Sequence, residues 1–156
     1  MNTFVEDVIS YVSKKFGLDN DIKDKVSVDD AYDENVTLVP PHIFIQEIDD
    51  SEAQQYSTFD GELISYVPIQ ITAYCQQMEI ANQTVTAKKA SAIFADKIKA
   101  MFDTLEAIKW NKNIKLMRRV GETPSMPTQK GITTYFSPIR YDFYLNYKYQ
   151  KIKQRR

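Results

Sequence analysis

The residues that could perform chemistry in this chain are few and far apart. His42 is its single histidine and Cys75 its single cysteine. Ser-His-Asp and Cys-His mechanisms would have to use His42, which follows a pair of prolines and has no nucleophile motif beside it. Cys75 falls on the apolar side of an alternating segment, where a buried structural thiol is expected. We therefore expect no catalytic site and no enzymatic activity.

Motifs for phosphates and metal ions are missing as well. The chain has four widely spaced glycines, Gly17, Gly61, Gly121 and Gly131. Neither a P-loop nor a dinucleotide-binding loop can be built from this spacing. Neighbouring acids such as Asp49 and Asp50 offer oxygen ligands for a hard cation, but the EF-hand spacing is absent and a solvated loop is expected instead. The sequence predicts no cofactor and no metal site.

Length and composition indicate one globular domain. The 156 residues suffice for one sizeable hydrophobic core, and 43% hydrophobic and 26% charged residues are ordinary proportions. Ten tyrosines and eight phenylalanines stand against one tryptophan, which favours a β-rich protein whose tyrosines suit interfaces. A lone cysteine excludes an internal disulfide. Without a signal-peptide pattern or a run of about 18 apolar residues, we expect neither standard secretion nor a membrane span.

Charge is divided by position along the chain. Residues 19–62 contain thirteen acidic side chains and two lysines, a net charge of −11. Residues 88–156 contain sixteen Lys and Arg against five acids, a net charge of +11. If this division survives folding, the acidic surface of one copy attracts the basic surface of another, and such head-to-tail contacts close into rings or continue as filaments. Alternatively, the two halves interleave in one domain and the charges mix in space.

Two stretches predict amphipathic helices. Apolar residues recur at helical spacing over residues 3–16, and Gly17 follows as a C-cap. A second helix begins after Thr84 or Thr86, either of which can serve as N-cap. It runs to about Leu105 with an apolar stripe on one face and lysines largely on the other, so we expect one buried and one solvated face.

Four stretches have the pattern of β-strands. They are residues 42–48, 63–78, 114–120 and 133–149. Because proline cannot donate to a ladder, the first of these starts after Pro41 or lies at a sheet edge. Three polar segments separate the predicted elements, namely 18–35, 49–62 and 121–132. The first is expected to be a long solvated connection and the other two to be protruding loops.

The resulting element order is α-β-β-α-β-β. Each strand pair can form a hairpin, and the helices can cover one face of the sheet. We therefore predict an α+β fold in which a mainly antiparallel four-stranded sheet carries two helices on one face. Residues 1–150 are expected to form this single domain, and residues 151–156 a basic C-terminal tail that is mobile when free.

This succession of elements resembles a family of phage proteins. The amphipathic N-terminal helix, the strand pair with its long polar loop and the Lys-studded helix are followed by MRRVGETP and then by the strand YFSPIRYDFYLNYKY. The order is similar to that of small neck and tail-completion proteins of tailed bacteriophages, and above all to the tail terminator group, also labelled minor capsid proteins. The resemblance covers most of residues 1–150.

The resemblance implies a structural virion protein. Its copies would form a ring, usually of six subunits, that ends growth of the tail tube and joins the tail to the head connector or stopper protein. Assembly would occur in the host cytoplasm, without membrane or cofactor, and DNA would pass through the lumen. The alternatives are another neck or head-completion protein, or a DNA-contacting accessory protein whose Lys and Arg bind phosphates while nearby tyrosines stack on bases.

Contacts between subunits, or between a subunit and the tail, are expected from the charge division. The predicted interaction residues are Asp49, Asp50, Glu52, Arg118, Arg119, Arg140, Tyr141 and Tyr144. Arginine is favoured on the basic side because its guanidinium binds a carboxylate through two parallel hydrogen bonds. Tyrosine is favoured because an apolar ring with a polar tip suits a protein interface.

Overall fold

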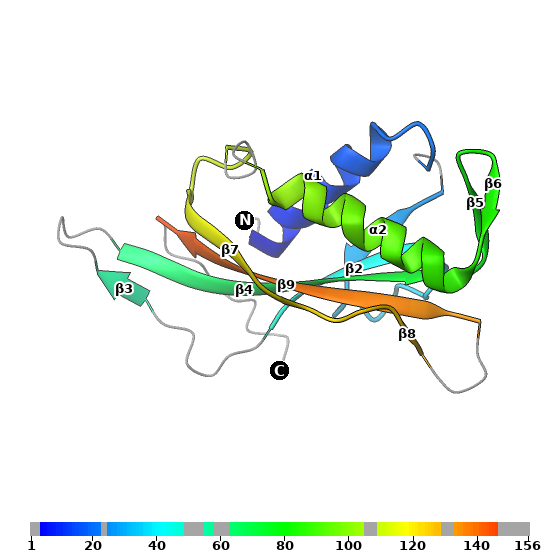
Figure 1. Ribbon diagram of the computed structural model, residues 1–156. Helices are drawn as coiled ribbons and strands as arrows, with labels where there is room; N and C mark the ends of the chain where they lie inside the picture. Colours follow the sequence, from blue (N-terminus) through cyan, green and yellow to red (C-terminus); the bar gives the residue numbers. More distant parts are fainter. Residues whose placement is uncertain are drawn as a thin grey trace.

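A computed structural model of the chain describes residues 4–22, 25–48, 55–57, 63–104, 109–128 and 133–146, leaving aside the side chains of 55–57 and 63. Within these residues the fold is α+β, and one mixed sheet carries two helices on the same face (Figure 1). The predicted fold class and the placement of both helices on one face are confirmed. The predicted C-terminal tail, 151–156, lies outside the described residues.

The described part of the main sheet has seven strands. Its path β1-β2-β4-β9-β7 consists of β1 (Ser27–Asp30), β2 (His42–Glu47), β4 (Leu63–Cys75), β9 (Tyr135–Leu145) and β7 (Ile114–Glu122). Two short strands lie off this path: β3 (Gln55–Ser57) pairs with β4, and β8 (Met126–Pro127) pairs with β9. A separate hairpin is formed by β5 (Met78–Ile80) and β6 (Gln83–Val85). Consequently β1 and β7 are the two end strands of this path.

The four predicted strands correspond to β2, β4, β7 and β9, which are antiparallel neighbours. The predicted four-stranded sheet was too small, because β1 forms inside the acidic segment expected to be a solvated connection. Here β1 pairs parallel to β2, with Val28 opposite Ile43, so the ladder satisfies the backbone of a segment whose side chains are mostly polar. The loop predicted at 121–132 was partly wrong as well, because β7 extends to Glu122 and β8 pairs with β9.

Helix α1 (Phe4–Gly17) packs over β1 and β2. Its buried residues recur at helical spacing, as the sequence predicts: Phe4, Val5, Val8, Val12 and Phe16. Phe4 reaches the far strand as well, because its ring meets that of Phe143 edge-on at 4.9 Å. The aromatic contact joins α1 to β9, so the first and last described elements share one core.

Helix α2 (Ala87–Phe102) packs over β4 and β9. Thr86 is its N-cap, and the Thr86 hydroxyl accepts a hydrogen bond from the Lys89 amide at 3.3 Å. The buried face of α2 ends in Phe102, whose ring lies 5.0 Å from that of Tyr141. The start at Thr86 is confirmed, whereas the described helix ends at Phe102, short of Leu105.

Strand β7 contains two register shifts against β9, one between Ile114 and Leu116 and one between Arg119 and Gly121. Residues 116–119 between these bulges keep strict register with β9. Simple alternation over 114–120 would place Ile114 and Leu116 on one face. The first bulge separates them, because Ile114 is buried opposite Leu145 while Leu116 is exposed opposite Tyr144.

Candidate functional site

His42 has a structural environment. Its Nε2 donates to the Asp29 carboxylate at 2.7 Å, since its Nδ1 already accepts the Val39 backbone N–H at 3.1 Å. The ring is buried and stacks on Phe44 with centroids 4.1 Å apart. Both ring nitrogens therefore tie β2 to β1 and to the segment before it, and this is the geometry of a cross-link between chain segments.

Cys75 ends β4 under the helices and is fully buried. Burial raises the pKa of its thiol to about 12, because the apolar surroundings disfavour the thiolate. The thiol is therefore protonated at neutral pH, which is the opposite of what a nucleophile or metal ligand requires. The expectation of a buried structural thiol is confirmed.

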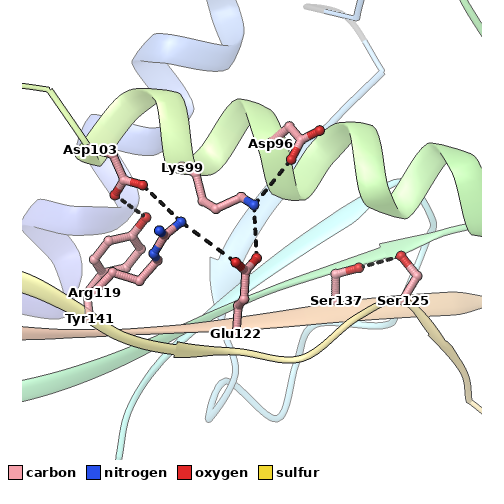
Figure 2. Close-up of polar contacts among 8 residues, drawn as sticks. All are labelled: Asp96, Lys99, Asp103, Arg119, Glu122, Ser125, Ser137 and Tyr141. Carbon is pink, nitrogen blue, oxygen red and sulfur yellow. Dashed lines mark hydrogen bonds and ion pairs between the residues drawn. The ribbon is translucent and has the colours of Figure 1, made fainter.

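A network of ion pairs joins α2 to β7 on the helix-covered side (Figure 2). Lys99 contacts Asp96 at 3.3 Å and Glu122 at 2.9 Å, and the hydrogen bond to Glu122 raises the pKa of the Lys99 ammonium. Arg119 contacts Asp103 at 3.0 Å and Glu122 at 3.8 Å. Three carboxylates thus share two cations, so these basic residues are largely neutralised within the chain.

Tyr141, a residue of β9, also joins this network through Asp103. Its hydroxyl donates to Asp103 at 3.1 Å, and the side chain is fully buried beneath α2 (Figure 2). Burial and the neighbouring Asp103 carboxylate raise the pKa of Tyr141, so the phenol keeps its proton. Tyr141 was predicted as a contact residue between subunits, but strand alternation turns its side chain toward the helices, where it is buried.

A groove of about 580 Å³ runs beside this network, between α2 and the segment that follows β7. Its polar wall is engaged internally: Ser91 donates to Ser125 at 2.6 Å, and Ser125 and Ser137 are hydrogen-bonded at 2.8 Å (Figure 2). Among the described side chains, no group of three His, Cys, Asp or Glu is arranged to hold a metal ion. The groove therefore marks the packing boundary between α2 and the sheet, and its serine hydroxyls bond to one another.

The helix-free face of the sheet carries a second charged cluster, which we call the Asp142 cluster: Tyr66, Arg118, Arg140, Asp142 and Tyr144. Asp142 is only 4% exposed, and its Oδ1 accepts from Tyr66 at 3.0 Å and from Arg140 at 3.3 Å. Arg140 also donates to the Tyr66 hydroxyl at 3.0 Å. Arg118 lies at 3.9 Å from Asp142 with 63% of its side chain exposed. The cluster therefore pairs one buried carboxylate with two guanidinium groups.

Partly exposed aromatic rings lie on the same face as the Asp142 cluster. Tyr144 packs against Tyr66 with centroids 5.3 Å apart. Toward the other end of the face, Tyr74 stacks on Phe136 at 5.6 Å, and Phe44 meets Tyr74 edge-on at 5.8 Å. Aromatic and arginine side chains are the types enriched in the cores of protein interfaces.

The predicted interaction residues divide among three places. Arg118, Arg140 and Tyr144 come together in the Asp142 cluster, whereas Arg119 and Tyr141 face α2. The three predicted acids lie outside the described residues: Asp49, Asp50 and Glu52. Tyr66 and Asp142 were not predicted. Counting every second residue from Arg140 would have found Asp142, and the β4 to β9 register places Tyr66 beside it.

The two ends of the sheet path differ in charge. On β1, Asp29 and Asp30 are followed by the exposed residues Asp33 and Glu34. At the other end, β7 carries Lys115 and Arg118, whereas its Arg119 and Glu122 belong to the ion-pair network with α2. The two halves also meet, because Lys97 on α2 forms an ion pair with Asp19. Folding therefore mixes some charges and leaves acids and bases concentrated at opposite edges.

No family model matches the chain, and no curated protein is similar to it in sequence. Neither described helix is long and apolar enough to cross a lipid bilayer.

Proposed function

We propose that this chain is a structural subunit of a phage tail, a ring-forming protein of the tail terminator kind. In this proposal identical copies, six in the expected ring, sit at the head-proximal end of the tail and stop growth of the tail tube. The ring joins the tail to the head connector or stopper protein and lets DNA pass through its lumen. The role requires no cofactor and no chemistry, and the protein would act in the virion after assembly in the host cytoplasm.

One observation carries the proposal: the opposite edges of one open sheet bear opposite charges. The β1 edge and the turn after it are acidic, and the β7 edge is basic. Two unlike surfaces on opposite sides of a subunit favour heterologous contacts, and these close into a ring when the rotation between copies allows it. Electrostatic complementarity also speeds correct docking and disfavours contacts between like edges.

The helix-free face supports the same proposal. Its partly exposed side chains are rich in aromatic residues, and its charged residues include Arg118 and Arg140. Surfaces of this composition are typical of protein interfaces. Because Asp142 offsets one of the two guanidinium groups, the cluster offers a phosphate backbone little net charge, so this face favours a protein partner over DNA.

The mass of the purified protein across an ionic-strength series tests the proposal. We expect a closed oligomer at low salt in light scattering, a ring in negative-stain images, and dissociation as salt screens the charged edges. Binding of the ring to the ends of purified tails would test its place in the virion. A protein that stays monomeric at every salt concentration and ignores tails would overturn the proposal.

A further inference from the structure

The Asp142 cluster has a charge that its own residues leave uncompensated. Two guanidinium groups, Arg118 and Arg140, share the single carboxylate of Asp142. Arg140 is held at hydrogen-bond distance, whereas Arg118 stands at 3.9 Å, too far for a hydrogen bond. A guanidinium has five N–H donors in a planar fork, so the cluster retains donors on a mostly exposed side chain.

The geometry of the cluster fits a carboxylate ligand. Tyr66, which accepts a hydrogen bond from Arg140, packs against Tyr144, and the two rings provide a partly apolar wall that strengthens an ion pair by excluding water. An incoming carboxylate would complete an alternating arrangement of two anions and two guanidinium groups. A nucleic acid binds through many phosphates and would gain little from this cluster, because Asp142 offsets one of the two guanidinium groups.

Complementary carboxylates are present on the same molecule. Asp33 and Glu34 are exposed in the turn that follows β1, at the far end of the sheet path from β7. The Asp33 carboxylate accepts the Asn35 backbone N–H at 3.0 Å, so the turn is internally ordered. Because donor cluster and acidic turn lie toward opposite ends of the path, a second copy can supply the acids in a head-to-tail contact.

We propose that the Asp142 cluster binds the acidic turn of a second copy, with Arg118 and Arg140 receiving the carboxylates of Asp33 and Glu34. The inference rests on the proposed ring and names the residues of its repeating contact. It assigns Arg119, the chain neighbour of Arg118, to a contact within the subunit, since Arg119 is engaged with Asp103 at the end of α2. The two adjacent arginines therefore have different roles.

Charge reversal on each side of the contact tests this pairing. Arg118→Glu changes a mostly exposed side chain, and Asp33→Lys with Glu34→Lys changes exposed residues of a turn, so both variants are expected to fold. Each variant alone places like charges in the contact, and its dissociation constant should rise by at least about tenfold. Lys112→Glu, an exposed residue in the same basic half, is the control with the same change in net charge as Arg118→Glu.

Mixing the two variants gives the decisive result. In a mixture, the glutamate introduced in one variant meets the lysines introduced in the other, and the native Arg118 meets native acids, so every contact in an alternating oligomer is complementary. We expect the mixture to recover oligomers in light scattering, and the Lys112→Glu control to associate as the original protein does. If both variants associate normally, or if each fails alone and the mixture fails too, the proposed pairing is wrong while the ring survives. A monomeric original protein would instead overturn the ring itself.

Discussion

Charged side chains on the two faces of the sheet differ in their contacts and exposure, as the neighbouring residues Arg118 and Arg119 show. Arg119 points toward α2, where Asp103 holds it at 3.0 Å inside the network that joins helix to strand. Arg118 points to the helix-free face, where its contact with Asp142 is 3.9 Å long and its side chain is 63% exposed. Because adjacent strand residues point to opposite faces, Arg119 contributes to the stability of the subunit and Arg118 stays accessible to a partner.

The aromatic residues of β9 follow the same division. Tyr141 and Phe143 are fully buried under the helices, whereas Tyr144 lies half-buried on the helix-free face. Rings under the helices contact rings from α1 and α2, and Tyr144 contacts only another sheet residue among the described aromatic pairs. Substitutions on the two faces should accordingly affect different measurements.

The largest difference is expected between Phe143→Ala and Tyr144→Ala. Phe143→Ala removes a ring packed against Phe4 and Phe102 and should lower the free energy of unfolding by about 3–5 kcal/mol. Tyr144→Ala removes a half-buried ring paired with Tyr66, and should cost only about 1 kcal/mol. Urea denaturation of both variants measures the difference. Equal losses would mean that the helix-free face contributes to the core as much as the covered face does.

Asp103→Ala should have the next largest effect. It leaves the buried hydroxyl of Tyr141 without its acceptor and removes the partner of Arg119, so we expect a loss of about 1–3 kcal/mol in unfolding free energy. Tyr141→Phe in the same background should then cost little more, because the hydroxyl is already unpaired. A double-mutant cycle by urea denaturation checks this coupling, and additive losses would contradict it.

Alkaline pH should lower the free energy of unfolding through Cys75, which is buried under the helices. The folded thiol has a pKa of about 12 against an ordinary value of 9.0, so the unfolded chain loses its proton first as pH rises. The contribution of the thiol to stability is therefore fully present below pH 9. Above pH 9 the free energy of unfolding falls by about 1.4 kcal/mol per pH unit, up to about pH 12. Cys75→Ala should make this fall shallower between pH 9 and 10, where most tyrosines of the unfolded chain, with an ordinary pKa of about 10, still keep their protons. Unfolding curves with an unchanged pH slope in that variant would show that another group is responsible.

The sequence predicts the covered face better than the helix-free face. Apolar residues at helical spacing place α1, and alternation along 63–75 places one side of β4 in the core, because burial imposes a regular pattern on the residues that undergo it. On the helix-free face, Tyr66 and Asp142 follow no such pattern. They meet only through the register of β4 against β9, a contact between segments far apart in the chain.

Strands stabilised mainly by their backbones were also missed. The acidic residues of β1 look like those of a loop, and the hydrogen bonds to β2 that make it a strand leave no trace in its side chains. The bulges in β7 were missed as well. A one-residue shift in register changes the face on which each later residue lies, but it leaves the composition of the strand unchanged. The sequence pattern also grouped Arg118 with Arg119, whereas adjacent strand residues point to opposite faces and the structure separates the two side chains.

The smallest expected effect separates those two arginines in the isolated subunit. Arg119→Gln removes a partly exposed ion pair that links β7 to α2, and should lower the free energy of unfolding by about 0.5–1 kcal/mol. Arg118→Gln removes a longer contact and should change it by less than about 0.5 kcal/mol. Urea denaturation at salt concentrations that keep the protein monomeric measures both, since association would otherwise add to the apparent stability. High salt should narrow the gap, because screening reduces the larger contribution, that of the Arg119 pair, by the larger amount. If Arg118→Gln proved the more destabilising, Arg118 would be needed to stabilise the buried carboxylate of Asp142. The main role of the cluster would then be the stability of the subunit and not the binding of a partner.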